Sequence, residues 1–202
     1  MKKKKNNLVF KKLFGIATPI VYISDIKIQK GVEEEFQTAW KKFYRRAKPL
    51  VSPSREEKLK KCMQRIWKEK TDKYYCRRVA IRYIGPKIGF GVFAVEDIPP
   101  YSTLTHYAGI LRPERSIRPS YDSTFAFTKF KAFSIDAMHY GNWARFMNHG
   151  EGSSINVIPW ELYLPEGPRI VFSAGRKGIK KGEQLLYSYG DEYWEEKKFE
   201  LL

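Results

Sequence analysis

Cysteine and histidine are scarce in this chain, which has two cysteines and three histidines among its 202 residues. Two cysteines are too few for a disulfide scaffold or for a cysteine-rich zinc cluster. A single bridge between Cys62 and Cys76 is one alternative, and two reduced thiols in a cytosolic or nuclear protein is the simpler interpretation. The sequence therefore predicts no metal site.

Long apolar runs are also missing, because no stretch reaches the roughly 20 apolar residues that cross a bilayer as a helix. Residues 1–5 and 13–23 together resemble a secretory signal peptide only loosely. Lys11 and Lys12 interrupt the apolar stretch, Pro19 lies inside it, and no small-residue cleavage site follows. We expect neither a membrane span nor a cleaved leader.

Acidic residues are few in the first 80 residues, where 8 Asp and Glu stand against 23 Lys and Arg. The remaining residues carry 14 against 15 and are nearly neutral. Such a basic region favours polyanions, nucleic acid ahead of anionic membrane, so DNA contact through residues 1–80 is one expectation. A helical brace with a solvated basic surface is the simpler one, and both can hold.

The pattern of apolar residues divides the chain near residue 75. Amphipathic helices are predicted over residues 31–48 and 54–70, with Ser54 capping the second and Pro53 ending the first segment. From Cys76 onward short strands with closely spaced turns predict a β-rich domain. We expect a basic, mostly helical region over 1–75, the β-rich domain over 76–195 and a tail over 196–202. The predicted strands are 19–28, 79–84, 89–95, 104–110, 124–130, 132–135, 155–159, 162–164, 169–174 and 182–187, and 191–202 is a predicted short helix.

Three separated motifs carry the polar and aromatic residues of interest. The first is Gly89-Phe90-Gly91, which alone indicates no more than a β-turn. The second covers residues 135–149, mixes polar with core-forming residues and ends in Asn148-His149. The third is Tyr187-Ser188-Tyr189-Gly190. Buried polar groups need partners, so the second motif predicts a ligand site or an unusually polar part of the core.

In this order and spacing, the three motifs resemble the SET-domain protein lysine methyltransferases over about residues 79–195. A further Tyr-x-Gly of the family corresponds to Tyr107-Ala108-Gly109. The length and the basic extension are most similar to the short bacterial SET proteins of the chlamydial type. The resemblance implies a β-rich SET fold of small sheets, in which the Asn-His and Tyr-x-Tyr segments pass each other in a pseudoknot.

The resemblance also implies a reaction, the transfer of a methyl group from S-adenosyl-L-methionine to a lysine amine. The other product is S-adenosyl-L-homocysteine. A solvated lysine is protonated at neutral pH, and an aromatic channel that removes water lowers its pKa. By family match, Tyr189 is the main catalytic tyrosine and Tyr107 a second one. Tyr187 lies at the family's tyrosine-or-phenylalanine switch, and its hydroxyl predicts mono- or dimethylation.

The same match implies a cofactor-binding set, which is Gly89, Phe90, Gly91, Arg145, Asn148, His149 and Trp194. Asn148 would bond the amino-acid end of the cofactor, and His149 would act mainly through its backbone. Trp194 would cover the adenine. We expect the nearby Asp136 and Asn142 to be structural.

The chain departs from the family pattern directly after His149. Where the family usually has Ser-Cys-x-Pro-Asn, residues 150–156 retain only Asn156, so one ligand of a zinc held by many members is missing. We expect a zinc-free enzyme whose lid is the tail from residue 191. Phe125 corresponds to a position that is often tyrosine in the family, which implies one lost cofactor contact.

The implied substrate is a basic protein, a histone or a bacterial histone-like protein. The implied location is a bacterial cytoplasm or nucleoid, or a host-cell nucleus after export. Two alternatives are a non-catalytic SET-fold adaptor and a nucleic-acid-binding protein that uses the basic N-terminal region. Tyr107, Tyr189 and Asn148 argue against the adaptor.

Overall fold

The computed structural model describes residues 9–47, 52–69, 76–117, 123–191 and 193, and in this part of the chain the strands form five small sheets. The largest, in the order β2–β6–β8–β7, combines Lys27–Ile28, Ile110–Pro113, Phe133–Asp136 and Thr124–Ala126. The sheet β11–β12–β5 combines Val157–Leu164, Gly167–Ala174 and Thr103–His106. The two-stranded sheets are β3–β4 (Val79–Gly85, Gly89–Ala94), β1–β9 (Val21–Tyr22, Tyr140–Gly141) and β10–β13 (Asn148–His149, Leu186–Tyr187).

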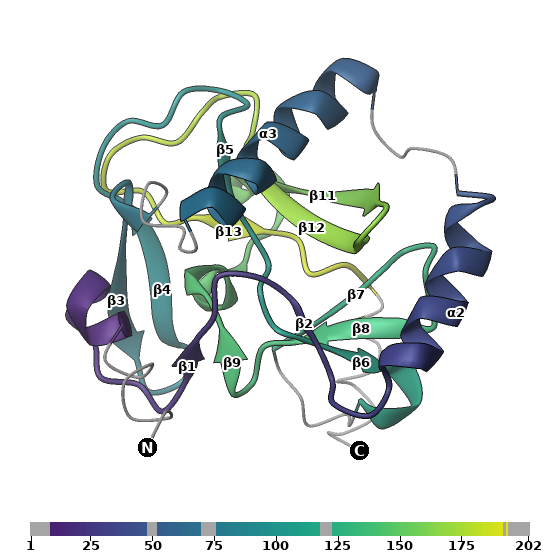
Figure 1. Ribbon diagram of the computed structural model, residues 1–202. Coiled ribbons are helices and arrows are strands. Elements are labelled where there is room, and N and C mark those ends of the chain that lie inside the picture. Colours follow the sequence, from purple (N-terminus) through teal and green to yellow (C-terminus); the bar gives the residue numbers. More distant parts are fainter. Residues whose placement is uncertain (1–8, 48–51, 70–75, 118–122, 192, 194–202) are drawn as a thin grey trace.

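The α-helices α2 (Glu33–Tyr44) and α3 (Pro53–Glu69) cover these sheets, and residues 9–14 form a further short helical segment. Three short 3-10 helices are η1 (Glu114–Ser116), η2 (Trp143–Phe146) and η3 (Gly152–Ser154). Figure 1 shows α3 above the β11–β12 sheet, α2 beside the β6–β8 sheet, and the β3–β4 hairpin on the opposite side of the molecule. No helix among the described residues combines the length and the apolar character of a membrane span.

Helix α2 shows why the predicted amphipathic segment folds where it does. Glutamates fill its first turn and lysines its last, which matches the helix dipole. Its apolar stripe buries Phe36 and Trp40 completely against the rings of Phe130 and Phe133, at centroid distances from 5.1 to 6.3 Å. Burial of two such rings contributes roughly 2 to 3 kcal/mol each, so α2 is held by packing.

The predicted cap of α3 was wrong. The helix begins at Pro53, so Ser54 lies in its first turn, and the backbone N–H of Glu56 donates to the carbonyl of Ser52. Proline suits the first helical position because its missing N–H would have no partner there and its φ is already helical. Pro53 therefore starts a helix that we expected it to precede.

Several strand boundaries also differ from the prediction. The predicted strands 155–159 and 162–164 form one strand, β11, because β11 is an edge strand and tolerates Pro159. Strand β7 ends at Ala126, since the N–H of Thr128 donates to the side chain of Glu161 and leaves the ladder. The predicted strand 104–110 is interrupted between β5 and β6, so Tyr107 and Gly109 leave the sheet.

The pseudoknot is visible in the pairing of β10 with β13, which lie parallel although 38 residues separate them in register. Asn148 pairs with Leu186, and the N–H of Gly150 donates to the carbonyl of Tyr187. On its other side Leu186 is held by Asn156, whose N–H donates to the Leu186 carbonyl and whose Oδ1 accepts from the Leu186 N–H. The late segment therefore lies between the two ends of the loop 150–156, in the threaded arrangement that the sequence resemblance implies.

Candidate active site

A cavity of about 410 Å³ lies between β7 and the residues that follow β13. Six aromatic residues from three separate segments line it: Tyr107, Phe125, Phe127, Tyr187, Tyr189 and Tyr193. The charged residues at the cavity are Lys131, Arg145 and Asp191. The cavity therefore combines apolar ring faces with hydroxyl groups, which suits a long side chain that ends in a polar group.

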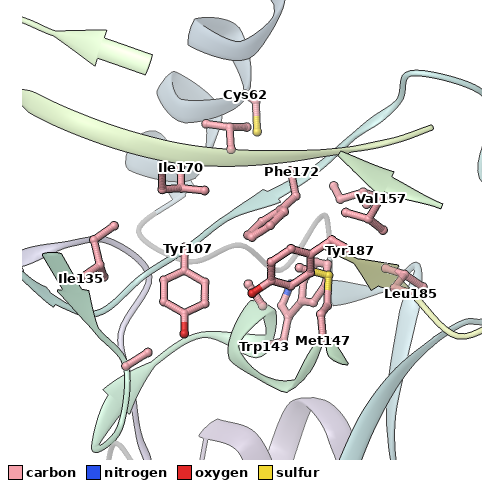
Figure 2. Packing of buried hydrophobic residues seen from close by; sticks show 14 of the residues in the cluster. Cys62, Tyr107, Ile135, Trp143, Met147, Val157, Ile170, Phe172, Leu185 and Tyr187 are labelled. Carbon is pink, nitrogen blue, oxygen red and sulfur yellow. The ribbon is translucent and has the colours of Figure 1, made fainter. Parts of the chain in front are cut away.

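The rings stand in a fixed relation to one another. Tyr187 stacks on Phe125 at 6.0 Å between centroids with 12° between ring planes, and Tyr107 packs against Phe125 at 5.5 Å. Phe172 of β12 packs against both tyrosines, with its ring centroid 6.3 Å from that of Tyr107 and 5.1 Å from that of Tyr187. Figure 2 shows the three rings next to one another. The walls are thus supported by a fully buried ring and cannot turn freely.

The hydroxyl groups of Tyr107 and Tyr189 are hydrogen-bonded to backbone carbonyls. Tyr107 donates to the carbonyl of Ser123 and Tyr189 to that of Met147, each at 2.8 Å. Within the described residues the Tyr187 hydroxyl has no such partner, although its side chain is only 6% exposed. Burial raises the pKa values of Tyr107 and Tyr187, so both hydroxyls stay neutral at physiological pH.

Arg145 links this wall to the second motif. Its Nε donates to the carbonyl of Ala137 and its NH2 group to the Oγ of Ser123, both at 2.8 Å. Burial lowers the pKa of Arg145, and the neighbouring Tyr107 acts against that decrease. Ser123 therefore accepts a hydrogen bond from Tyr107 on its carbonyl and one from Arg145 on its hydroxyl. These two bonds fix the positions of both side chains.

Tyr189 joins the cavity to the Asn-His segment. Its N–H donates to Nδ1 of His149 at 3.1 Å, while its hydroxyl donates to Met147, so both ends of the residue are tied to the same short stretch. The rings of His149 and Tyr189 meet edge to face at 5.4 Å. The His149 side chain thus holds the Tyr189 backbone, and its role toward a cofactor stays a prediction.

The glycine motif lies next to Asn148. The Nδ2 of Asn148 donates to the carbonyl of Phe90 at 3.1 Å. A Cβ on Gly91 would come within 2.5 Å of Ile84 Cδ1, 2.7 Å of Gln184 Nε2 and 3.3 Å of Asn148 Nδ2. Gly89 has a φ of 78°, a conformation that L residues other than glycine rarely adopt. The structure therefore brings the first and second motifs into direct contact.

The structure places most of the predicted site residues in two adjoining groups. Tyr107, Tyr187, Tyr189 and Arg145 line the cavity, whereas Phe90, Gly91 and Asn148 form the neighbouring group. Trp194 and most of the predicted lid lie outside the described residues. The described residues contain no group of three or more His, Cys, Asp or Glu side chains placed to hold a metal ion, and the expectation of a zinc-free enzyme stays a prediction.

Sequence reasoning missed Ser123, which had no assigned role and which accepts hydrogen bonds from both Tyr107 and Arg145. Phe125 was expected near the site through a lost cofactor contact, and the structure places it half-buried and stacked on Tyr187 in the cavity wall. Tyr193 belongs to the predicted lid, had no role of its own, and packs edge to face on Tyr189 at 4.9 Å. The alternation of Phe125 with Phe127 could not assign either ring to the cavity, because alternation does not tell a core face from a cavity face.

Comparison with known proteins gives a consistent match. Residues 89–190 match the family described as SET domain. The human protein named histone-lysine N-methyltransferase EHMT1 is 31% identical over 116 residues, which cover 54% of this chain and 9% of that protein. This chain thus spans only a small part of that relative.

Two solved structures are similar. One is ctPRC2 in an autoinhibited conformation bound to S-adenosylmethionine, with a TM-score of 0.50 and 28% identity over 61% of this chain and 16% of the other. ATXR5 in complex with histone H3.1 gives a TM-score of 0.67 at 19% identity and covers 94% of this chain and 88% of the other, which shows a shared fold.

Proposed function

The chain belongs to the SET-domain family, and from this premise we propose that it is an S-adenosyl-L-methionine-dependent protein-lysine N-methyltransferase. The observation that carries the proposal is the aromatic cavity of about 410 Å³ whose Tyr189 is bonded to both Met147 and His149. A lysine side chain in this cavity would lie directly beside the segment predicted to hold the cofactor. Tyr189 would then contact both the bound lysine and the segment that holds the cofactor.

The residues that would hold the cofactor are Gly89, Phe90 and Gly91 together with Asn148, Arg145 and the backbone of His149. They fit such a group because a Cβ on Gly91 would displace the ends of the Ile84, Gln184 and Asn148 side chains, and because Asn148 offers an amide. When bound, S-adenosyl-L-methionine supplies a methyl group on a sulfonium, and Trp194 would complete its site.

The chain's own contribution is to deliver a neutral amine. Rings of Tyr107, Phe125 and Tyr187 would surround the lysine stem and exclude water, which lowers the pKa of the amine. The amine would lose its proton to solvent before it attacks, and its nitrogen would form the new bond to carbon as the sulfonium leaves as a thioether. Because Tyr107 and Tyr187 remain neutral, they orient the amine by hydrogen bonding and do not remove its proton as phenolates.

We assign the substrate to a histone or a histone-like basic protein, a class supported by the name of the human relative. The basic N-terminal region would place the enzyme on a nucleoid or on host chromatin. Tyr187 supports mono- or dimethylation, because its hydroxyl occupies the space that a third methyl group needs and can hold a water molecule.

Labelled cofactor with core histones or a bacterial histone-like protein tests this proposal. The wild type should transfer label, and Tyr189→Phe should do so about tenfold more slowly or worse, because the bond to Met147 that orients the ring is lost. Tyr44→Phe on α2, outside the cavity, is the matched control and should match the wild type. Equal rates for Tyr189→Phe and wild type would refute the role of Tyr189. No transfer to any basic protein, with no cofactor binding by calorimetry, would refute the enzyme.

A second proposal is nucleic-acid binding by the basic region, favoured by one surface of α2. Lys41, Lys42, Arg45 and Arg46 line a shallow hollow with Thr38, and all four cations are exposed. In the described part of the chain none of the four lies in an ion pair, whereas Lys60, Lys61 and Arg78 do. Lys41 and Lys42 lie in the last turn of α2 and Arg45 and Arg46 follow it directly, and this cluster of four cations at the end of α2 suits a phosphate backbone.

The salt dependence of DNA affinity tests this second proposal. Replacing the four α2 cations with alanine should weaken binding to duplex DNA and reduce the slope of log affinity against log salt by about 3 to 4. The control removes the same charge from exposed cations elsewhere: Lys87, Lys129, Arg176 and Lys177. An equal loss of DNA affinity in both variants would show that net charge alone determines binding and that the α2 cations form no specific binding surface. DNA binding without methyl transfer by the wild type would instead favour the non-catalytic adaptor.

A further inference from the structure

A cluster of polar and charged side chains lies behind the Tyr107 wall, and one of its members, Asp25, lies outside the residues 89–190 that match the family. Asp25 stands between β1 and β2, and its Oδ1 is 3.4 Å from Nε2 of His106 and 3.3 Å from Nε of Arg169. The side chain of His106 is fully buried and that of Arg169 is 9% exposed. One carboxylate oxygen therefore meets two buried nitrogen groups from two different strands.

The two partners of Asp25 flank a critical hydrogen bond. His106 ends β5 directly before Tyr107, and Arg169 on β12 directly precedes Ile170. The N–H of Tyr107 donates to the carbonyl of Ile170 at 2.8 Å. Asp25 thus contacts His106, the residue before the donor Tyr107, and Arg169, the residue before the acceptor Ile170. It therefore connects the two strands at the hydrogen bond that holds the Tyr107 backbone.

The segment that carries Asp25 is itself fixed on both sides of the cluster. The N–H of Ile23 donates to the carbonyl of Gly141, and the N–H of Lys27 donates to the carbonyl of Gly109, two residues after Tyr107. Figure 1 shows this segment passing from β1, beside β9, to β2, beside β6. Asp25 is therefore presented to the cluster by a paired backbone.

We propose that Asp25 is a positioning residue for Tyr107, which acts by joining His106 of β5 to Arg169 of β12. This inference rests on the proposed function for its kinetic consequence. The aromatic wall is then held at two points: Ser123 fixes the hydroxyl of Tyr107 from the cavity side, and Asp25 fixes its backbone from behind. Loss of Asp25 leaves the buried Arg169 without this carboxylate and loosens the strand pair at that point.

Asp25→Asn in the full chain tests the proposal, with Glu35→Gln in the exposed pair with Arg115 as the control. Amide hydrogen exchange should speed up about tenfold or more at Tyr107. The amide of Ala174, which donates to Ser102 at the other end of the same sheet, should change much less. At saturating cofactor and substrate kcat should fall about tenfold, while cofactor affinity stays that of the wild type. His106→Gln, which keeps the other half of the cluster, should reproduce both effects to a smaller degree.

The outcomes separate the two proposals. Unchanged exchange at Tyr107 would overturn the positioning role, and so would an equal increase at Tyr107 and Ala174, because it would report general destabilisation. Faster exchange at Tyr107 with unchanged kcat would also overturn it. If the wild type transfers no methyl group, the proposed function fails, and the exchange measurement alone decides whether Asp25 holds the Tyr107 backbone.

Discussion

Acid should remove a specific part of the stability of this protein through Asp25. Burial of this carboxyl raises its pKa, but the close contact with His106 and the positive charge of Arg169 outweigh burial and lower the pKa from 3.8 to about 2. A carboxyl whose pKa is lower in the folded than in the unfolded protein stabilises the fold at pH values above the unfolded pKa. That stability is lost as the pH falls toward the folded pKa, so the window lies below about pH 4.

The size of the effect follows from the two pKa values. A decrease from 3.8 to about 2 corresponds to about 2 kcal/mol of folding free energy at neutral pH. The Asp25 side chain is 29% exposed, so solvent screens it only in part. About half of this contribution should be lost near pH 3. Asp25→Asn should therefore destabilise the protein by about 2 kcal/mol at pH 7 and by about 1 kcal/mol near pH 3.

Urea unfolding at several pH values between 3 and 7, followed by circular dichroism, measures this difference. The wild type and Asp25→Asn should approach each other in unfolding free energy as the pH falls. Glu35→Gln removes one partner of an exposed ion pair with Arg115, and such pairs contribute little. The difference in unfolding free energy between wild type and Asp25→Asn should not stay constant or grow on acidification. Either result would show that the Asp25 carboxylate does not stabilise the fold through its contacts with His106 and Arg169.

Three further substitutions have distinct expected results. Tyr187→Phe should shift the products of methyl transfer toward higher methylation states in intact-mass spectra, and an unchanged product distribution would contradict the assigned role of its hydroxyl. Gly91→Ala should leave the urea midpoint nearly unchanged, because the ends of the Ile84 and Gln184 side chains can move, but should weaken cofactor binding in calorimetry. Gly109→Ala should instead lower the unfolding free energy by about 1 to 3 kcal/mol, because its Cβ would lie 2.6 Å from the backbone oxygen of Asp136. Equal stability of the two glycine variants would contradict this distinction.

The sequence identified the tyrosines of the site but could not show how they meet. Tyr107 and Tyr187 carry recognisable motifs, yet 80 residues separate them, and their rings share Phe125 and Phe172 as neighbours. The parallel register of β10 and β13 brings Tyr187 beside His149, and a two-residue strand leaves no periodic signal in a sequence. Motif order can be predicted from the chain, whereas the pairing that assembles the motifs depends on contacts far apart in sequence.

Local chemistry explains the smaller errors. Proline was interpreted as a helix breaker at Pro53 and as a strand boundary at Pro159, although a first helical position and an edge strand are the places where proline is tolerated. The strand predicted through Thr128 ends early because Glu161 captures its N–H. Each of these outcomes depends on where the residue lies in the folded protein, which the local sequence pattern does not show.

The use of the three hydroxyl groups suggests a division of roles within the cavity. Tyr107 and Tyr189 each donate to a backbone carbonyl, so their hydroxyls are already engaged in holding the wall. Tyr187 lines the cavity, and its hydroxyl has no hydrogen-bond partner in the described part of the chain. An incoming amine or a water molecule in the cavity could therefore bond to it. Tyr187 is therefore the hydroxyl best placed to meet the substrate nitrogen, which is why its loss should change the methylation state more than the fold.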